Sequence, residues 1–174
     1  MFDNIVANNE INFNELEKKI YKFVCDLGCN LIKEIIEKYD EKLQQERNKK
    51  NFRHRGLKSD SIKTVMGVVE FKRTIYEYEE NKQKKYIYLL DEKLKFSEFG
   101  KISNNLADKI LNIAVQTNSY RDAAEQLMQT LNIYISHETV RDIVLKAGVK
   151  IIEKENEEIK LNKRNKLVAG TKQI

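Results

Sequence analysis

Apolar residues recur every three or four positions across residues 13–47, and this period predicts one long helix. A helix of roughly 30 residues would be about 45 Å long, although Gly28 could interrupt it. So long a stripe cannot be buried entirely against a small domain. We therefore expect the helix to pack on a second copy of itself or on the rest of a larger protein. The stripe consists of Phe13, Leu16, Ile20, Phe23, Leu27, Leu31, Ile35, Tyr39 and Leu43.

A strand-like pattern replaces the helical period over residues 61–90, which are rich in valine, isoleucine, threonine, tyrosine and phenylalanine. It predicts a three-stranded antiparallel sheet, which must pack on helices to be stable. Its tyrosines could stack on nucleic-acid bases, but cross-strand packing over a core is the favoured interpretation. The expected strands are 61–66, 67–80 and 84–90, the expected turns are Met66-Gly67 and 79–85, and the tyrosines are Tyr76, Tyr78, Tyr86 and Tyr88.

Residues 119–148 predict two short helices joined by a tight apolar connection. Ser119 and Ser136 are candidate N-caps, and Gly148 is a candidate stop for the second helix. A preceding helix, capped by Ser103, completes a three-helix unit of the helix-turn-helix type. The connection from Leu131 to Ser136 is longer than the usual turn of this motif. The second helix is expected to turn His137, Glu138, Arg141, Asp142 and Lys146 outward.

The predicted fold class is α+β and mainly α. It combines a long N-terminal helix, a small three-stranded antiparallel sheet, a helix-turn-helix-like three-helix unit and a C-terminal charged helix or linker. Within it, 91–102 is expected to be a connector. The expected divisions are 1–50 (packing or dimerisation helix), 51–100 (basic segment and sheet), 101–148 (three-helix unit) and 149–174 (charged helix or linker).

Composition narrows the class of protein only mildly. The chain has a net charge of +5, 34% charged residues and 41% hydrophobic residues, which is enough for a core and compatible with a nucleic-acid partner. No apolar run is long enough for a membrane span, and no signal-peptide pattern is present, so we expect a cytoplasmic protein. Cys25 and Cys29 have no further cysteine or histidine nearby to complete a zinc site, so buried reduced thiols are expected.

Residues 47–58, RNKKNFRHRGLK, are basic and contain no acid. A basic run with interleaved Phe52 and His54 suits phosphate contact. A solvated linker explains the same composition equally well. If the segment does bind DNA, the expected phosphate contacts are Arg53, Arg55 and Lys58.

No catalytic constellation stands out. His54 and His137 are the only histidines and lie in unrelated segments, and no nucleophile elbow, phosphate loop or metal-binding histidine pair is present. The residues therefore predict a protein without catalytic residues, metal site or cofactor of its own.

The order of five segments nevertheless resembles a known family. RHRG–LK, KTVMGVVEFKRTIYEY, YIYLLDEKL, SYRDAAEQL and ISHETVRDIV follow one another as in the N-terminal half of bacterial insertion-sequence transposases of the ISLre family, formerly catalogued as uncharacterised. The resemblance implies a protein that binds its element's ends. In full-length relatives, an Asp-Asp-Glu triad with two divalent metals cuts and joins the DNA. That domain would begin after Ile174, so the resemblance implies a truncated transposase that binds DNA without cleaving or transferring strands.

Double-stranded DNA is thus the expected partner. Arg121, His137, Thr139, Arg141 and Lys146 would approach the duplex. The alternative is a regulatory fragment that forms a homodimer or interacts with an intact transposase through its long helix. A nuclease or transferase in its own right is the least favoured reading.

Overall fold

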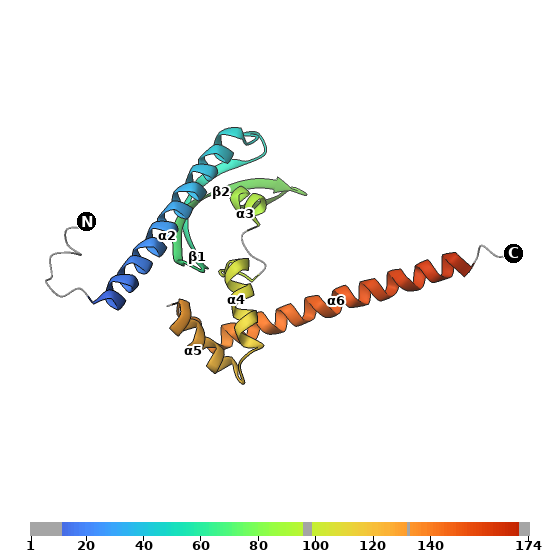
Figure 1. Cartoon of the computed structure of the whole chain (residues 1–174). Coiled ribbons are helices and arrows are strands. Elements are labelled where there is room, and N and C mark those ends of the chain that lie inside the picture. Colours follow the sequence, from blue (N-terminus) through green and yellow to red (C-terminus); the bar gives the residue numbers. More distant parts are fainter. Residues whose placement is uncertain (1–11, 96–98, 132, 171–174) are drawn as a thin grey trace. The chain divides into compact units, whose positions relative to one another are not determined.

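The computed structural model describes residues 12–95, 99–131 and 133–170, with side chains up to residue 161. The chain forms two compact units, residues 1–106 and 107–174. Figure 1 shows the helices and strands of each. The predicted α+β class, with a long first helix and a three-stranded antiparallel sheet, is confirmed.

The long helix α2 spans Phe13–Glu46 and begins at Asn12, whose side chain accepts a hydrogen bond from the Asn14 amide. It runs through Gly28 without interruption. The glycine serves another purpose: a Cβ at this position would overlap the sulfur of Met66 at the tip of the first hairpin. A residue without a side chain therefore lets the hairpin tip pack closely on the helix.

The sheet contains β1 (Arg53–Thr64), β2 (Gly67–Glu80) and β3 (Gln83–Ile87) in the order β1-β2-β3. The first turn was predicted one residue too late, because Thr64 pairs with Gly67 and leaves Val65 and Met66 as the turn. The second turn is Asn81-Lys82, with φ of 53° and 60°. Positive φ at both positions is the geometry of a type I′ hairpin turn.

Strand β1 begins eight residues before the predicted position 61, which corrects the interpretation of 53–58 as a linker. The basic residues form a strand because β2 is long enough to pair with them, as far as Arg53 opposite Glu77. A bulge lies between His54 and Leu57, where Gly56 has a φ of +116°. Local composition could not predict this strand, because the paired residues within 53–58 have partners 15 to 24 positions away in the sequence.

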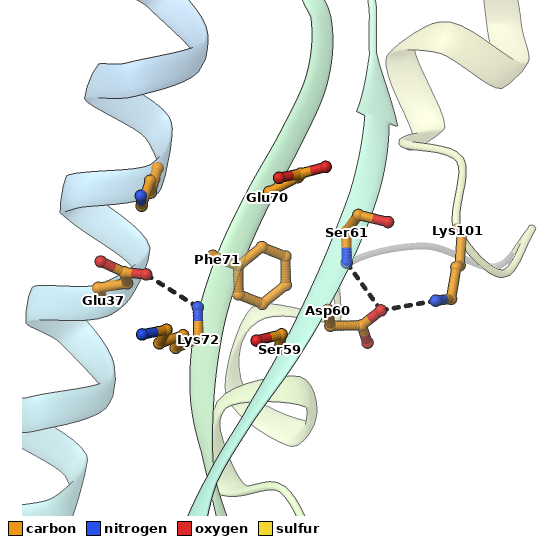
Figure 2. Close-up of a pocket in the computed structure, with 9 residues that line it drawn as sticks. Glu37, Ser59, Asp60, Ser61, Glu70, Phe71, Lys72 and Lys101 are labelled. Carbon is orange, nitrogen blue, oxygen red and sulfur yellow. Dashed lines mark hydrogen bonds and ion pairs between the residues drawn. The ribbon is translucent and has the colours of Figure 1, made fainter.

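Helix α2 covers the part of the β2 edge that β3 leaves open. Strand β3 pairs only with Tyr76–Glu80. Further along this edge, the Glu37 carboxylate accepts a hydrogen bond from the Lys72 amide at 2.8 Å (Figure 2). Asp40 accepts two from Thr74, from the amide at 2.8 Å and from the hydroxyl at 2.7 Å. Acidic side chains of a helix thus complete a sheet edge that would otherwise expose unpaired donors.

The core of the first unit lies between α2, the sheet and the short helix α3 (Leu89–Leu94). This helix was not predicted, since its residues were assigned to the end of a strand and to a connector. Of the predicted stripe on α2, only Tyr39 and Leu43 pack in the core, and the remaining contacts come from positions outside the stripe. The core residues are Ile36, Leu43, Ile62, Val69, Phe71 and Leu90, with Cys29, Ile32, Tyr39 and Leu89 packed against them.

Three helices follow: α4 (Asn104–Ala114), α5 (Tyr120–Leu131) and α6 (His137–Gly170). All three predicted serine caps are confirmed. Ser103 accepts a hydrogen bond from the Leu106 amide, Ser119 from Asp122 and Ser136 from Thr139, at 3.1–3.2 Å.

The prediction that Gly148 ends the second helix is wrong. Helix α6 continues to Gly170, and Gly148 does not have the positive φ of a helix-ending glycine. The charged segment after it is rich in lysine and glutamate, which are good helix formers. The predicted helix or linker is thus a helix as far as residue 170, and residues 171–174 lie outside the described part. None of the described helices is long and apolar enough to cross a membrane.

Candidate nucleic-acid interface

Helices α5 and α6 form a pair whose inward sides are buried. Ala123 and Leu127 anchor α5, and Val140 and Ile143 anchor α6; all four are buried. In the connection, Ile133 and Ile135 are also buried. The connection therefore packs inward and delivers Ser136 to the cap position, and α6 starts at a defined point.

Four of the five residues predicted to approach DNA from this unit are exposed. Arg121 lies in the first turn of α5, and His137, Arg141 and Lys146 lie on the first three turns of α6. Thr139 is half-buried, and its hydroxyl shares a hydrogen bond of 2.8 Å with Ser136 Oγ. Thr139 thus belongs to the cap, whereas the other four side chains are accessible to a ligand.

The charges at this helix end are mixed, because Glu138 and Asp142 lie beside Arg141 and Lys146. The N-terminal end of a helix carries a partial positive charge, which adds to the basic side chains. Arg141 lies 3.4 Å from Asp142, with both side chains more than half exposed. Such a pair contributes little and is easily exchanged for a contact with phosphate or a base.

The three basic residues predicted on the 47–58 segment lie on β1, in the first unit. Arg53 and Lys58 are exposed. Arg55 is engaged with the buried carboxylate of Glu77, to which its Nε and Nη2 donate hydrogen bonds of 2.9 and 2.6 Å. The hydrogen bond from Arg55 lowers the pKa of Glu77 by more than burial raises it. Arg53 and Lys58 are thus the accessible cations of this group.

A shallow groove of about 490 Å³ opens beside these residues. Its walls carry three cations and two acids, together with Phe52 and Tyr78, whose rings are 6.1 Å apart. An aromatic pair beside cations suits a nucleic-acid strand, but the acids reduce the positive charge. The groove is lined by Lys50, Asn51, Phe52, Arg53, Glu77, Tyr78, Glu79 and Lys84.

Two of the tyrosines in the sheet region have structural roles, and a third is exposed. Tyr76 is fully buried, and its hydroxyl pKa is raised by that burial. Tyr88 lies under the guanidinium of Arg73, at 3.9 Å from its ring centre. Both therefore have the structural role that the sequence favoured, whereas Tyr86 is 60% exposed.

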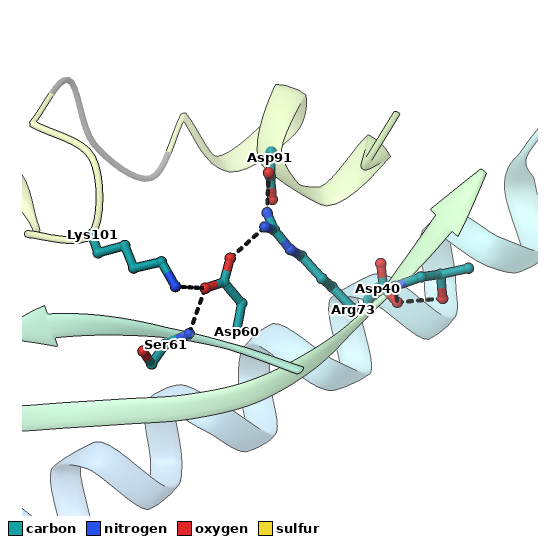
Figure 3. Close-up of polar contacts among 7 residues, drawn as sticks. Asp40, Asp60, Ser61, Arg73, Asp91 and Lys101 are labelled. Atoms are coloured by element: carbon teal, nitrogen blue, oxygen red, sulfur yellow. Dashed lines mark hydrogen bonds and ion pairs between the residues drawn. The ribbon is translucent and has the colours of Figure 1, made fainter. Parts of the chain in front are cut away.

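Sequence reasoning missed a partly buried polar cluster around Arg73, shown in Figure 3. The guanidinium of Arg73 bridges the carboxylates of Asp60 and Asp91, and Lys101 contacts Asp60 at 2.8 Å. Burial alone would raise the pKa of Asp60, but hydrogen bonds from Lys101 and the Ser61 amide and the charge of Arg73 lower it overall. The cluster ties β1, β2 and α3 together.

The same cluster borders two open pockets. Figure 2 shows the larger, of about 420 Å³, between α2 and the sheet. Both are lined by side chains of mixed charge, and Asp60 and Lys101, which line both, pair with each other. Among the described residues, no group of three or more histidine, cysteine, aspartate or glutamate side chains is placed to hold a metal ion.

Comparison with known proteins gives one family. A model described as "Uncharacterised protein family (UPF0236)" matches residues 6–169. A UPF0236 protein of Caldanaerobacter subterraneus subsp. tengcongensis is 26% identical over 161 residues, which cover 92% of this chain and 33% of that protein. A second from the same organism is 25% identical over 156 residues, covering 89% of this chain and 32% of that protein. The chain thus spans about a third of the length of these curated relatives.

Proposed function

The chain belongs to the uncharacterised protein family UPF0236, and we propose that it is the DNA-binding part of a transposase, recognising the ends of a mobile element without cutting them. The resemblance of its segments to ISLre-type transposases supports this reading. So does the name of one Caldanaerobacter relative, which joins eleven designations from one organism. We interpret each designation as one gene copy. Repetition of a gene within a genome is what a self-copying element produces.

The observation that carries the proposal is the geometry of α5 and α6. The second helix is capped by Ser136, anchored by Val140 and Ile143, and presents His137 and Arg141 outward from its first two turns. A recognition helix of the helix-turn-helix type contacts base edges with its N-terminal residues. Arg141 is the best placed for such a contact, because arginine donates two hydrogen bonds to guanine.

Removal of the Arg141 side chain tests this assignment. Arg141→Ala should weaken binding to a duplex carrying the element's terminal sequence by about 1–3 kcal/mol, or roughly 5- to 150-fold. Fluorescence anisotropy with that duplex and a scrambled duplex of equal length measures the effect. Lys154→Ala is the matched control, because it removes one exposed positive charge from the same helix, more than three turns away. Equal loss in the two variants would show that Arg141 contributes only charge.

The proposal also includes an absence of strand chemistry in this chain. Incubation with the same duplex and Mg²⁺ or Mn²⁺ should leave the DNA intact. A nicked or joined product that depends on the metal and on purified protein would overturn this part of the proposal.

A further inference from the structure

Helix α2 has two apolar faces, of which the fold uses one. Cys29, Ile32, Ile36 and Leu43 pack against the sheet. Apart from Tyr21, seven large apolar residues between Phe13 and Ile35 remain 39–73% exposed. Leu27 and Cys29 illustrate the arrangement: two positions correspond to about 200° around a helix, so they point in opposite directions. We call the exposed set the outer face of α2: Phe13, Ile20, Phe23, Val24, Leu27, Leu31 and Ile35.

The size of the outer face exceeds what a monomer normally exposes. With about half of each large side chain accessible, the seven residues present roughly 700 Å² of apolar surface. The largest apolar patch of a typical monomer is about 300–600 Å². A stable protein–protein interface buries about 800 Å² on each partner. The outer face alone therefore approaches the area that one side of a specific dimer needs.

We propose that the outer face of α2 binds the same face of a second copy of this chain, forming a two-fold symmetric dimer. A mainly apolar helix face suits such a dimer, because a symmetric dimer buries the same patch on both subunits. By helical periodicity, only Glu17 and Glu34 interrupt this face, one near each end. A surface with so few polar groups offers little to select a different partner.

The two glutamates also determine the expected direction. In a parallel pair in register, Glu17 would lie opposite Glu17 and Glu34 opposite Glu34, and the helix dipoles would be aligned. Like charges and aligned dipoles both oppose association. An antiparallel pair avoids both and brings the Phe13 end of one helix near the Ile35 end of the other. This dimer does not depend on DNA binding.

The mass of the full chain in solution tests the proposal. Sedimentation equilibrium should show a dimer at about 10 μM, because interfaces of this size have dissociation constants that are micromolar or tighter. The dimer should persist in about 1 M salt, where contacts between exposed charges are screened. A monomer at every concentration up to about 100 μM would overturn the proposal.

Two matched variants locate the contact. Val24→Gln with Leu27→Gln should raise the dissociation constant at least tenfold. Lys18→Gln with Lys22→Gln, which changes exposed residues on the opposite side of the same helix, should leave it unchanged. Glutamine is a good helix former, so α2 itself should be preserved, as checked by circular dichroism. Equal dissociation constants in the two variants would place the dimer contact elsewhere.

Cross-linking tests the direction of the pair. In a background without Cys25 and Cys29, Phe13→Cys and Ile35→Cys are each treated with a short bismaleimide. The antiparallel dimer predicts efficient linkage in a mixture of the two variants and little in Phe13→Cys alone. Efficient self-linkage of Phe13→Cys would show a parallel pair and overturn the proposed arrangement.

Discussion

At the scale of single residues, acidic side chains of α2 take the place of a missing strand. Asp40 is buried and accepts both donors of Thr74, whereas Glu37 is less buried and accepts only the Lys72 amide. A buried donor that loses its acceptor retains the full cost of its desolvation. Asp40 should therefore matter more to stability than Glu37.

Asp40→Ala should lower the free energy of unfolding by about 2–4 kcal/mol, because it leaves two buried donors unsatisfied. Urea denaturation followed by circular dichroism measures the loss. Glu37→Ala is the matched control and should cost about 0.5–1.5 kcal/mol, since one hydrogen bond near solvent is lost. A similar loss in free energy of unfolding for the two variants would mean that the buried contact contributes no more to stability than the exposed one.

Asp60 makes the stability of the first unit depend on pH. Its pKa in the folded protein is lowered, with hydrogen bonds from Lys101 and Ser61 and the charge of Arg73 outweighing the effect of burial. A carboxylate with a lowered pKa stabilises the fold above its unfolded pKa of about 3.9. This contribution is lost as pH falls through the lower, folded value.

The comparison of the protein with Asp60→Asn should reveal this dependence. The stability difference between them is expected to be largest near neutral pH and to shrink below about pH 4. Denaturation at a series of pH values measures it. Lys101→Met, which removes one hydrogen-bond partner of Asp60, should reduce the slope of stability against pH in the acid range. A difference that stays constant from neutral to acid pH would contradict the assignment.

At the scale of helices and strands, the sequence could predict what depends on neighbouring residues. Ser103, Ser119 and Ser136 were identified as caps because a cap bonds to an amide three residues later. The predictions failed where the partner is remote. Strand β1 extends to Arg53 because β2 pairs with it, and the partly buried Arg73 is held by Asp60 and Asp91 from other elements.

Replacement of glycine by alanine should have opposite effects on stability at Gly148 and at Gly56. A Cβ would meet no atom within 4 Å at either position, but Gly56 has a φ of +116°. Gly148→Ala should therefore stabilise α6 by about 0.5–1 kcal/mol, since alanine loses less conformational entropy in a helix. Gly56→Ala should destabilise the protein, because an alanine cannot adopt that φ without strain. Thermal unfolding of both variants checks the signs, and a loss of stability in Gly148→Ala would contradict the continuous α6.

At the scale of the whole molecule, the eight residues proposed for DNA fall into both units. Arg53, Arg55 and Lys58 belong to the first, and Arg121, His137, Thr139, Arg141 and Lys146 to the second. The sequence could name these residues from charge and pattern. It could not show that Arg55 is held by Glu77 or that Thr139 belongs to a cap, because both facts depend on how the chain folds. Arg53 and Arg121 are therefore the most informative exposed cations, one in each unit.

If both units contact one duplex, the salt dependence of binding should report it. The logarithm of affinity falls with the logarithm of salt concentration by about 0.9 for each phosphate neutralised. Arg53→Ala and Arg121→Ala should each reduce this slope by about one for every protomer bound, whereas Lys154→Ala should leave it unchanged. A titration from low to high salt measures all three against the unchanged protein. If only Arg121→Ala alters the slope, the second unit binds DNA alone, and the basic strand β1 then has a different role.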